Sequence, residues 1–233
     1  MTASSTDIPR PSEPASSGFR FASPDAFPSN SFQIYRDGLK RMMDICIIVL
    51  TASVTVTIIF VLALIVALHG QSPFYSQDRV GRGGRVYTMW KLRSMVNNAD
   101  QALEAHLAAD PAARAEWDLT QKLKNDPRIT RVGRLLRKSS LDELPQLWNV
   151  FRGDMSLVGP RPMMPQQSSL YPGQAYYRLR PGITGMWQVS ARNESSFAER
   201  AGFDADYDRE ISLRTDLGLL LATVRVVLRG TGH

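Results

Sequence analysis

Residues 45–68 form an unbroken stretch of 24 residues without a charged side chain, dominated by isoleucine, valine and leucine. As an α-helix the stretch would be about 36 Å long, at a rise of about 1.5 Å per residue. That length exceeds the roughly 30 Å thickness of a bilayer's hydrocarbon core. A helix that is apolar on every face suits lipid better than the core of a 233-residue protein. The sequence therefore predicts that residues 34–69 anchor the chain in a membrane.

Basic residues flank this apolar stretch on both sides. Lys40 and Arg41 precede it, and three arginines follow within residues 79–85. Because lysine and arginine tend to remain on the cytoplasmic side, this symmetry favours a re-entrant hairpin. The stretch contains neither proline nor glycine, which favours a straight spanning helix. Both geometries stay open, and both place residues 70–233 in the cytoplasm, because the larger basic region follows the stretch.

Residues 1–33 have a different composition from the rest of the chain. They are poor in aliphatic side chains and dense in serine, proline and alanine. Such a segment buries too little apolar surface to offset the entropy lost on ordering. We therefore expect residues 1–33 to be a disordered tail.

The remainder mixes strand and helix patterns, which predicts an α+β fold. Residues 74–95 read as a β-hairpin with Gly83-Gly84 as its turn. Residues 97–124 and 131–151 have helical compositions. We expect a membrane-embedded N-terminal helix, re-entrant or spanning, followed by a small cytosolic catalytic domain of helices and a β-hairpin.

The C-terminal third is less regular until its last segment. Residues 153–192 carry many glycines and prolines, which indicates loops built by tertiary contacts. Helical periodicity returns over residues 207–228, with leucines and valines on one face. That face suits either the membrane surface, as an interfacial amphipathic helix, or the protein core.

The charge balance indicates an anionic partner. The formal net charge is +6, and the isoelectric point is about 9.7. Nucleic acid, anionic lipid and phosphorylated substrates all fit such a balance. A nucleic-acid binder would explain the charge but not the apolar stretch, so we expect no salt-sensitive binding to DNA or RNA.

Cysteine and histidine offer little chemistry. The single cysteine, Cys46, excludes a disulfide framework within the chain, and the three histidines are scattered without ligand spacing. If the chain is an enzyme, carboxylates and basic side chains must perform its reaction.

Two cations occupy alternate positions at the end of the predicted hairpin. Lys91 and Arg93 would lie on one face of a strand. Two cations aimed together can bind a diphosphate. An exposed basic strand is the alternative.

Adjacent acids stand out in the basic segment that follows. Asp142 could attack a phosphorus atom as a carboxylate nucleophile, and Glu143 could hold Mg²⁺. The alternative is that residues 140–143 form a capping box, in which both acids only stabilise a helix start. Pro145 weakens that alternative, because proline within the first turns removes a backbone hydrogen bond.

Two further segments offer groups that could bind substrate. Arg161 stands between two prolines, which suits a rigid phosphate clamp or a rigid surface turn. In residues 181–192, glycines such as Gly182 would let backbone amides approach a ligand, and Trp187 offers a stacking face. A turn followed by a strand with a core tryptophan is the alternative. The other candidate substrate-binding side chains of this segment are Thr184, Gln188 and Arg192.

The order of these motifs carries more information than any one of them. The chain resembles the bacterial sugar transferases, the monotopic phosphoglycosyl transferases that begin exopolysaccharide and other glycan assembly, over about residues 38–231. The matching segments are Lys40-Arg41 with Asp44, then residues 72–81, 91–95, 140–149, 154–162 and 181–185.

The resemblance implies a two-step transfer at the cytoplasmic face of the bacterial inner membrane. Asp142 would attack the β-phosphate of a UDP-sugar and expel UMP. The phosphate of a polyprenyl lipid, undecaprenyl phosphate, would then attack the aspartyl phosphosugar and leave with the sugar phosphate. Glu143 is implied as the Mg²⁺ ligand, and Lys91, Arg137 and Arg161 as phosphate contacts. Which sugar is transferred stays open.

The chain departs from the family pattern in two places. The family's membrane helix commonly carries a Ser-Pro pair midway, where this chain has Val56-Thr57. Ala191 precedes Arg192 where glycine is common, and we expect the added methyl to adjust substrate fit. A membrane scaffold without catalysis is the competing hypothesis, although the intact acid pair argues against it. The sequence also leaves self-association into a homo-oligomer open.

Overall fold

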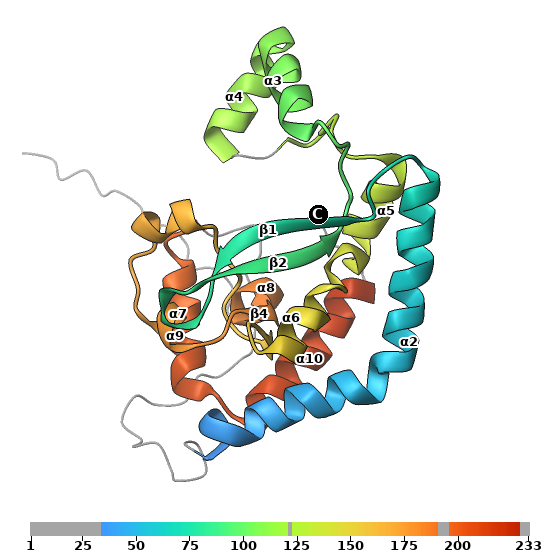
Figure 1. Cartoon of the computed structure of the whole chain (residues 1–233). Helices are drawn as coiled ribbons and strands as arrows, with labels where there is room; N and C mark the ends of the chain where they lie inside the picture. Colours follow the sequence, from blue (N-terminus) through green and yellow to red (C-terminus); the bar gives the residue numbers. More distant parts are fainter. Residues whose placement is uncertain (1–33, 121–122, 191–195, 229–233) are drawn as a thin grey trace, which may run out of the picture.

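A computed structural model describes residues 34–120, 123–190 and 196–228, so the predicted tail, residues 1–33, lies outside the described part of the chain (Figure 1). Helices and two small sheets are mixed, as an α+β fold requires. The elements are η1 (Tyr35–Leu39), α2 (Lys40–Leu68), β1 (Phe74–Val80), η2 (Arg82–Gly84), β2 (Val86–Leu92), α3 (Ala99–Ala109), α4 (Pro111–Thr120), α5 (Arg131–Lys138), η3 (Leu141–Glu143), α6 (Gln146–Arg152), β3 (Ser156–Val158), η4 (Pro165–Leu170), α7 (Ala175–Arg178), β4 (Gly182–Thr184), α8 (Met186–Ser190), α9 (Arg200–Glu210) and α10 (Leu213–Leu228).

The apolar stretch forms the single long helix α2, which by length and composition could cross a membrane. Figure 1 shows α2 bent sharply near its middle, so that it has two arms. Thr51, Thr55 and Thr57 donate hydroxyl hydrogen bonds to the carbonyls four residues earlier, at 2.8, 3.0 and 2.8 Å. Hydroxyl groups bonded in this way bend helices, which accounts for a bend without proline.

Both arms of α2 pack against the same body. In the first arm, buried Asp44 accepts hydrogen bonds from the Ser156 hydroxyl at 2.8 Å and from the Leu157 amide at 3.1 Å. In the second arm, Val66 joins a small apolar cluster with Leu92 at the end of β2 and with α5. The two ends of the helix are therefore fixed to one domain.

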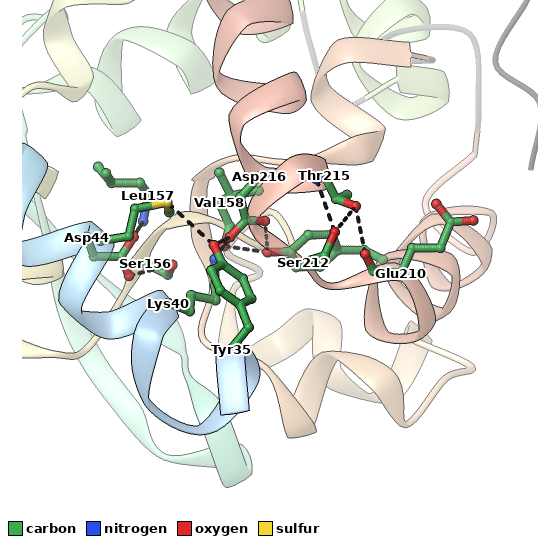
Figure 2. Close-up of polar contacts among 12 residues, drawn as sticks. Tyr35, Lys40, Asp44, Ser156, Leu157, Val158, Glu210, Ser212, Thr215 and Asp216 are labelled. Atoms are coloured by element: carbon green, nitrogen blue, oxygen red, sulfur yellow. Dashed lines mark hydrogen bonds and ion pairs between the residues drawn. The ribbon is translucent and has the colours of Figure 1, made fainter. Parts of the chain in front are cut away.

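A buried polar network ties the start of α2 to the C-terminal helices (Figure 2). Asp216 on α10 is 0% exposed and accepts three hydrogen bonds. The donors are the Tyr35 hydroxyl at 2.7 Å, the Lys40 ammonium at 2.6 Å and the Tyr207 hydroxyl at 2.6 Å. Together they satisfy the charge and most of the hydrogen-bonding capacity of the carboxylate.

The predicted hairpin is confirmed. β1 and β2 pair antiparallel, and Gly83 and Gly84 in the turn have φ of 70° and 79°. These positive values explain why glycine occupies the turn. Burial alternates along both strands, so Arg79, Met89 and Lys91 share the face that packs toward the body.

The two helical segments predicted between the hairpin and the glycine-rich region are both interrupted, the first into two elements and the second into three. The first divides at Asp110, whose carboxylate accepts amide hydrogen bonds from the start of α4. The second ends at Lys138, and η3 and α6 follow as separate turns. This break places the acid pair in a connection between α5 and α6.

The predicted helix over residues 207–228 is also two helices. The Ser212 oxygen accepts from the Thr215 amide at 3.2 Å, and the Thr215 hydroxyl donates to the Glu210 carbonyl at 2.7 Å (Figure 2). Ser212 thus caps α10. The exposed apolar side chains of α10 are Leu213, Leu217, Leu221, Val224 and Val227. Their exposure favours the membrane-surface interpretation of this helix over the core interpretation.

Candidate active site

The acid pair lies on η3, a short 3₁₀ turn entered through a strained residue. Ser140 has φ 56° and ψ 18°, the left-handed region that costs a non-glycine residue free energy. Its side chain makes no capping hydrogen bond, so the capping-box alternative is wrong. Asp142 and Glu143 therefore do not serve as helix caps, and their orientation needs another explanation.

Two cations flank the acid pair. The Lys91 ammonium lies 2.8 Å from a carboxylate oxygen of Glu143. Asp142 is 8% exposed, and burial raises the pKa of its carboxyl group. The nearby charges of Lys91 and Arg137 act to lower that pKa, whereas the charge of Glu143 raises it. Removal from water thus opposes ionisation, and the two cations support it.

Arg137 is held beside Asp142 by a contact with the end of the hairpin. Its Nε donates to the Ser94 hydroxyl oxygen at 2.9 Å. Burial lowers the pKa of this guanidinium, and the Asp142 charge raises it. The structure therefore brings Lys91 of β2, Arg137 of α5 and the acid pair of η3 together. Lys91 is far from the other three residues in the sequence.

A cavity of about 280 Å³ opens next to Glu143. One wall is aliphatic and comes largely from α10, where Leu220, Val226 and Val227 line it. Arg161 also borders the cavity, so cationic and anionic groups meet an apolar wall. Such a space suits a molecule that is part phosphate and part hydrocarbon.

Arg93 is not brought to this cluster. Its Nε donates to the Ser72 carbonyl at 2.9 Å, and its Nη2 donates to the Phe74 carbonyl at 3.3 Å. The guanidinium also lies over the Tyr75 ring, 5.7 Å from the centroid. Arg93 therefore braces the segment that leads into β1.

Gly182 lies where two backbone segments are in close contact. Its amide donates to the Pro160 carbonyl at 2.8 Å, and β4 pairs in parallel with β3 at this position. A Cβ atom on Gly182 would lie 2.1 Å from the Gly159 nitrogen. Glycine is thus required here because two chain segments touch, not because a ligand approaches.

The other predicted side chains of residues 181–192 have different environments. Thr184 borders the cavity, and its hydroxyl shares a 2.6 Å hydrogen bond with Thr223. Gln188 also borders the cavity. Trp187 is 5% exposed, with the Arg200 guanidinium 4.1 Å from its ring centroid, so its face is covered and the core-tryptophan alternative fits better. Arg192 lies outside the described residues.

Sequence reasoning assigned no role to Arg79 or Arg200. The charge of Arg161 acts on both of them, and burial followed by this charge lowers the pKa of Arg200 to about 10. Arg79 is one of the inward-facing residues of the hairpin. The alternation of inward and outward residues along a strand could have identified it from the sequence. Arg200 had no comparable signal.

A Mg²⁺ ion would have to be held partly by substrate. Within residues 34–120, 123–190 and 196–228, no group of three or more histidine, cysteine or acidic side chains could hold a metal. Mg²⁺ commonly uses one or two carboxylates and completes its shell with water and phosphate oxygens. Glu143 lines the cavity and Asp142 is its neighbour in the chain, so the carboxylate of Glu143 fits that arrangement.

Comparison with known proteins adds to this geometry. The model of a family described as bacterial sugar transferase matches residues 35–230. The chain is 47% identical over 196 residues to the UDP-galactose-lipid carrier transferase of Erwinia amylovora, covering 83% of this chain and 41% of the relative. It is 46% identical over 196 residues to the undecaprenyl-phosphate galactose phosphotransferase of Salmonella typhimurium, with the same coverage of 83% and 41%.

A third relative is similar in length. The exopolysaccharide production protein ExoY of Sinorhizobium fredii is 42% identical over 196 residues, which cover 83% of this chain and 87% of the relative. The chain thus spans about two fifths of the first two relatives and most of the third. The matched region includes α2 and the whole acid-pair site.

Proposed function

The chain belongs to the bacterial sugar transferase family, and from this premise we propose that it transfers a sugar 1-phosphate from a UDP-sugar to a polyprenyl phosphate, releasing UMP. The names of two relatives specify a lipid carrier or undecaprenyl phosphate, together with galactose. The observation that carries the proposal is the pairing of Asp142 and Glu143 with Lys91 and Arg137 beside a cavity that has an apolar wall.

The first step uses the ionised Asp142 carboxylate. One of its oxygens forms a bond to the β-phosphorus, and the bond from that phosphorus to the bridging oxygen breaks, so UMP leaves with the electron pair. Arg137 and Lys91 supply positive charge where negative charge accumulates. The second step reverses the roles: an oxygen of the lipid phosphate attacks the same phosphorus, and the Asp142 carboxylate leaves.

Glu143 would hold the Mg²⁺ ion. When bound, it would neutralise diphosphate charge and act as a Lewis acid. The Lys91 ammonium, 2.8 Å from Glu143, keeps that carboxylate beside the cavity. The covalent intermediate allows the two anionic substrates to bind in turn rather than together.

The bend in α2 supports a re-entrant placement in the inner membrane. Both arms contact one domain, so a bilayer about 30 Å thick cannot separate their ends. The apolar side chains around the bend, such as Leu50 and Val54, are exposed and would enter lipid. The exposed face of α10 would lie at the surface of the same leaflet, which brings the lipid acceptor to the apolar wall of the cavity.

UMP release from a panel of UDP-sugars tests this proposal. The full chain in detergent would be assayed with Mg²⁺ and undecaprenyl phosphate, beside the Asp142→Asn variant. Release by the unaltered chain alone, with one sugar preferred, is the expected result. A folded chain that releases UMP from no donor would contradict the transferase and leave the scaffold hypothesis. Equal release by both proteins would remove Asp142 from its role.

A further inference from the structure

The inward face of the hairpin has a cation near each end. Lys91 lies beside Glu143, and Arg79 pairs in register with Tyr87, four residues back along β2. At a rise of about 3.3 Å per residue, the two positions are about 13 Å apart. That separation is of the order of an extended nucleotide sugar. Figure 1 shows the turn between β1 and β2 beside α7, at the end of the hairpin that is remote from the second arm of α2.

Three guanidinium groups come together at this second end: those of Arg161 and Arg200 lie 5.9 and 4.1 Å from the centroid of the same Trp187 ring, and the charge of Arg161 acts on Arg79. Arg79 comes from β1, Arg161 from the loop after β3, and Arg200 from the start of α9. Burial lowers the pKa of Arg79, and the charge of Arg161 lowers it further. Arg200 is affected in the same order, by burial and then by Arg161. Like charges that are partly removed from water repel each other, so this cluster is unfavourable without an anion.

Parts of these arginines lack acceptors in the described part of the chain. The Nε atoms of Arg79 and Arg200 are buried and have no hydrogen-bond partner there. The acid that acts on Arg200 is Asp204, and burial raises its pKa to about 7 while the Tyr171 hydroxyl donates to it at 2.8 Å. One carboxylate, part protonated near neutral pH, does not balance three guanidinium groups.

Gln188 connects this cluster with the cavity. It is 8% exposed, and neither its amide oxygen nor its amide nitrogen has a partner among the described residues. It borders the cavity together with Arg161 and Glu143. Buried polar atoms without partners cost free energy, which a ligand with donors and acceptors would recover.

We infer that Arg79, Arg161, Arg200 and Gln188 form the site that holds the nucleoside phosphate end of the donor, with the transferred phosphate directed toward Asp142. The inference rests on the proposed function. A phosphate group is the chemistry that this cluster recognises, and both substrates carry one. Arg79 on β1 and Arg200 on α9 are not among the residues that line the cavity with its apolar α10 wall, so the soluble nucleotide rather than the lipid is the occupant of this cluster.

Calorimetric titration with UMP tests the inference, because UMP carries neither sugar nor lipid. Detergent-purified full chains with Arg79→Gln or Arg200→Gln should bind UMP at least about tenfold more weakly, because each loses a charge-assisted hydrogen bond. Arg209→Gln is the matched control: Arg209 lies on the same helix, is exposed and pairs with Asp206. It should bind UMP as the unaltered chain does.

A second variant separates binding from folding. Gln188→Leu removes two buried unpaired polar atoms, so its melting temperature should stay level or rise, while UMP binding weakens. A structural role for Gln188 would instead lower the melting temperature. If either arginine variant does not melt cooperatively, and is therefore not folded, UMP binding by the Gln188→Leu variant tests the inference in its place.

Other outcomes would overturn the assignment. Unchanged UMP affinity in folded variants would remove these residues from the nucleotide site. Unchanged UMP affinity with a raised KM for polyprenyl phosphate would show that the cluster binds the phosphate of the lipid instead. Turnover by the unaltered chain reports on the proposed function separately, since UMP binding requires no reaction.

Discussion

Asp216 and Asp142 are both buried carboxylates near a lysine, yet their surroundings differ. Asp216 accepts from two tyrosine hydroxyls and from Lys40. Asp142 receives a hydrogen bond from its own backbone amide and otherwise faces the charges of Lys91, Arg137 and Glu143. A carboxylate whose lone pairs are occupied by several donors holds elements together, whereas one that faces mainly charges, next to a residue that lines a cavity, suits the proposed attack. The degree of satisfaction thus separates a structural acid from a reactive one.

Replacement of the reactive acid should have the largest effect. Asp142→Asn removes the proposed nucleophile, so UMP release should fall by at least about a thousandfold. The melting temperature should change little, because the substitution removes a buried charge that few groups compensate. Kinetics and thermal melting in detergent would measure the two effects. A large loss of stability would place Asp142 with Asp216 as a structural acid.

Replacement of the structural acid should have the opposite profile. Asp216→Asn leaves the buried Lys40 ammonium without its partner, at a cost of about 3 kcal/mol, or a melting temperature lower by roughly 10 °C. Activity per folded molecule should persist. Asp206→Asn, in an exposed pair with Arg209, should cost about 0.5 kcal/mol or less. Equal melting temperatures for the two variants would contradict the comparison.

Lys91→Met should change the pH profile of the reaction. Asp142 must be ionised to attack, and the charge of Lys91 lowers its pKa. Without Lys91 that pKa rises, so the acid limb of kcat/KM should move to higher pH. The pH dependence of kcat/KM, measured for the unaltered chain and for Lys91→Met, would show the shift. An acid limb that does not move would mean that a group other than Asp142 causes it.

Asp204→Asn should change how the stability of the fold depends on pH. The folded pKa of Asp204 is about 7, above its ordinary value of 3.8, so the folded chain keeps a proton that the unfolded chain releases. The free energy of unfolding therefore falls as the pH rises from about 4 to about 7. The Asp204→Asn variant should lack the part of this decrease in unfolding free energy that comes from Asp204. Melting temperatures at pH 5 and pH 8 would test it, and an equal difference in both proteins would exclude Asp204 as the source.

Local patterns predicted the parts of the fold that depend on neighbours in the chain. The Gly83-Gly84 turn and the inward position of Lys91 follow from turn chemistry and strand alternation. The capping box at residues 140–143 failed although its sequence was suitable, because Ser140 adopts a left-handed backbone. Thr130 caps α5 instead, accepting from the Gly133 amide at 2.8 Å.

Contacts between distant segments could not be predicted in this way. Tyr35 and Asp216 are 181 positions apart, and no local periodicity relates them. Arg200 reaches Arg161 only because α9 packs beside α8. The grouping of Lys91, Arg137, Asp142 and Arg161 came from family resemblance, and residue patterns by themselves left each one with a plainer alternative.

The bend of α2 changes how the chain would respond to its membrane. Each arm of the 29-residue helix is about 22 Å long, less than a hydrocarbon core of about 30 Å. Neither arm can match the full thickness, so hydrophobic mismatch, which sorts spanning helices among membranes, exerts no comparable force on this anchor. In the proposed re-entrant placement, the bend that the three threonine hydroxyls accompany would keep the anchor in a single leaflet, and the lipid composition of that leaflet rather than its thickness would determine where the protein resides.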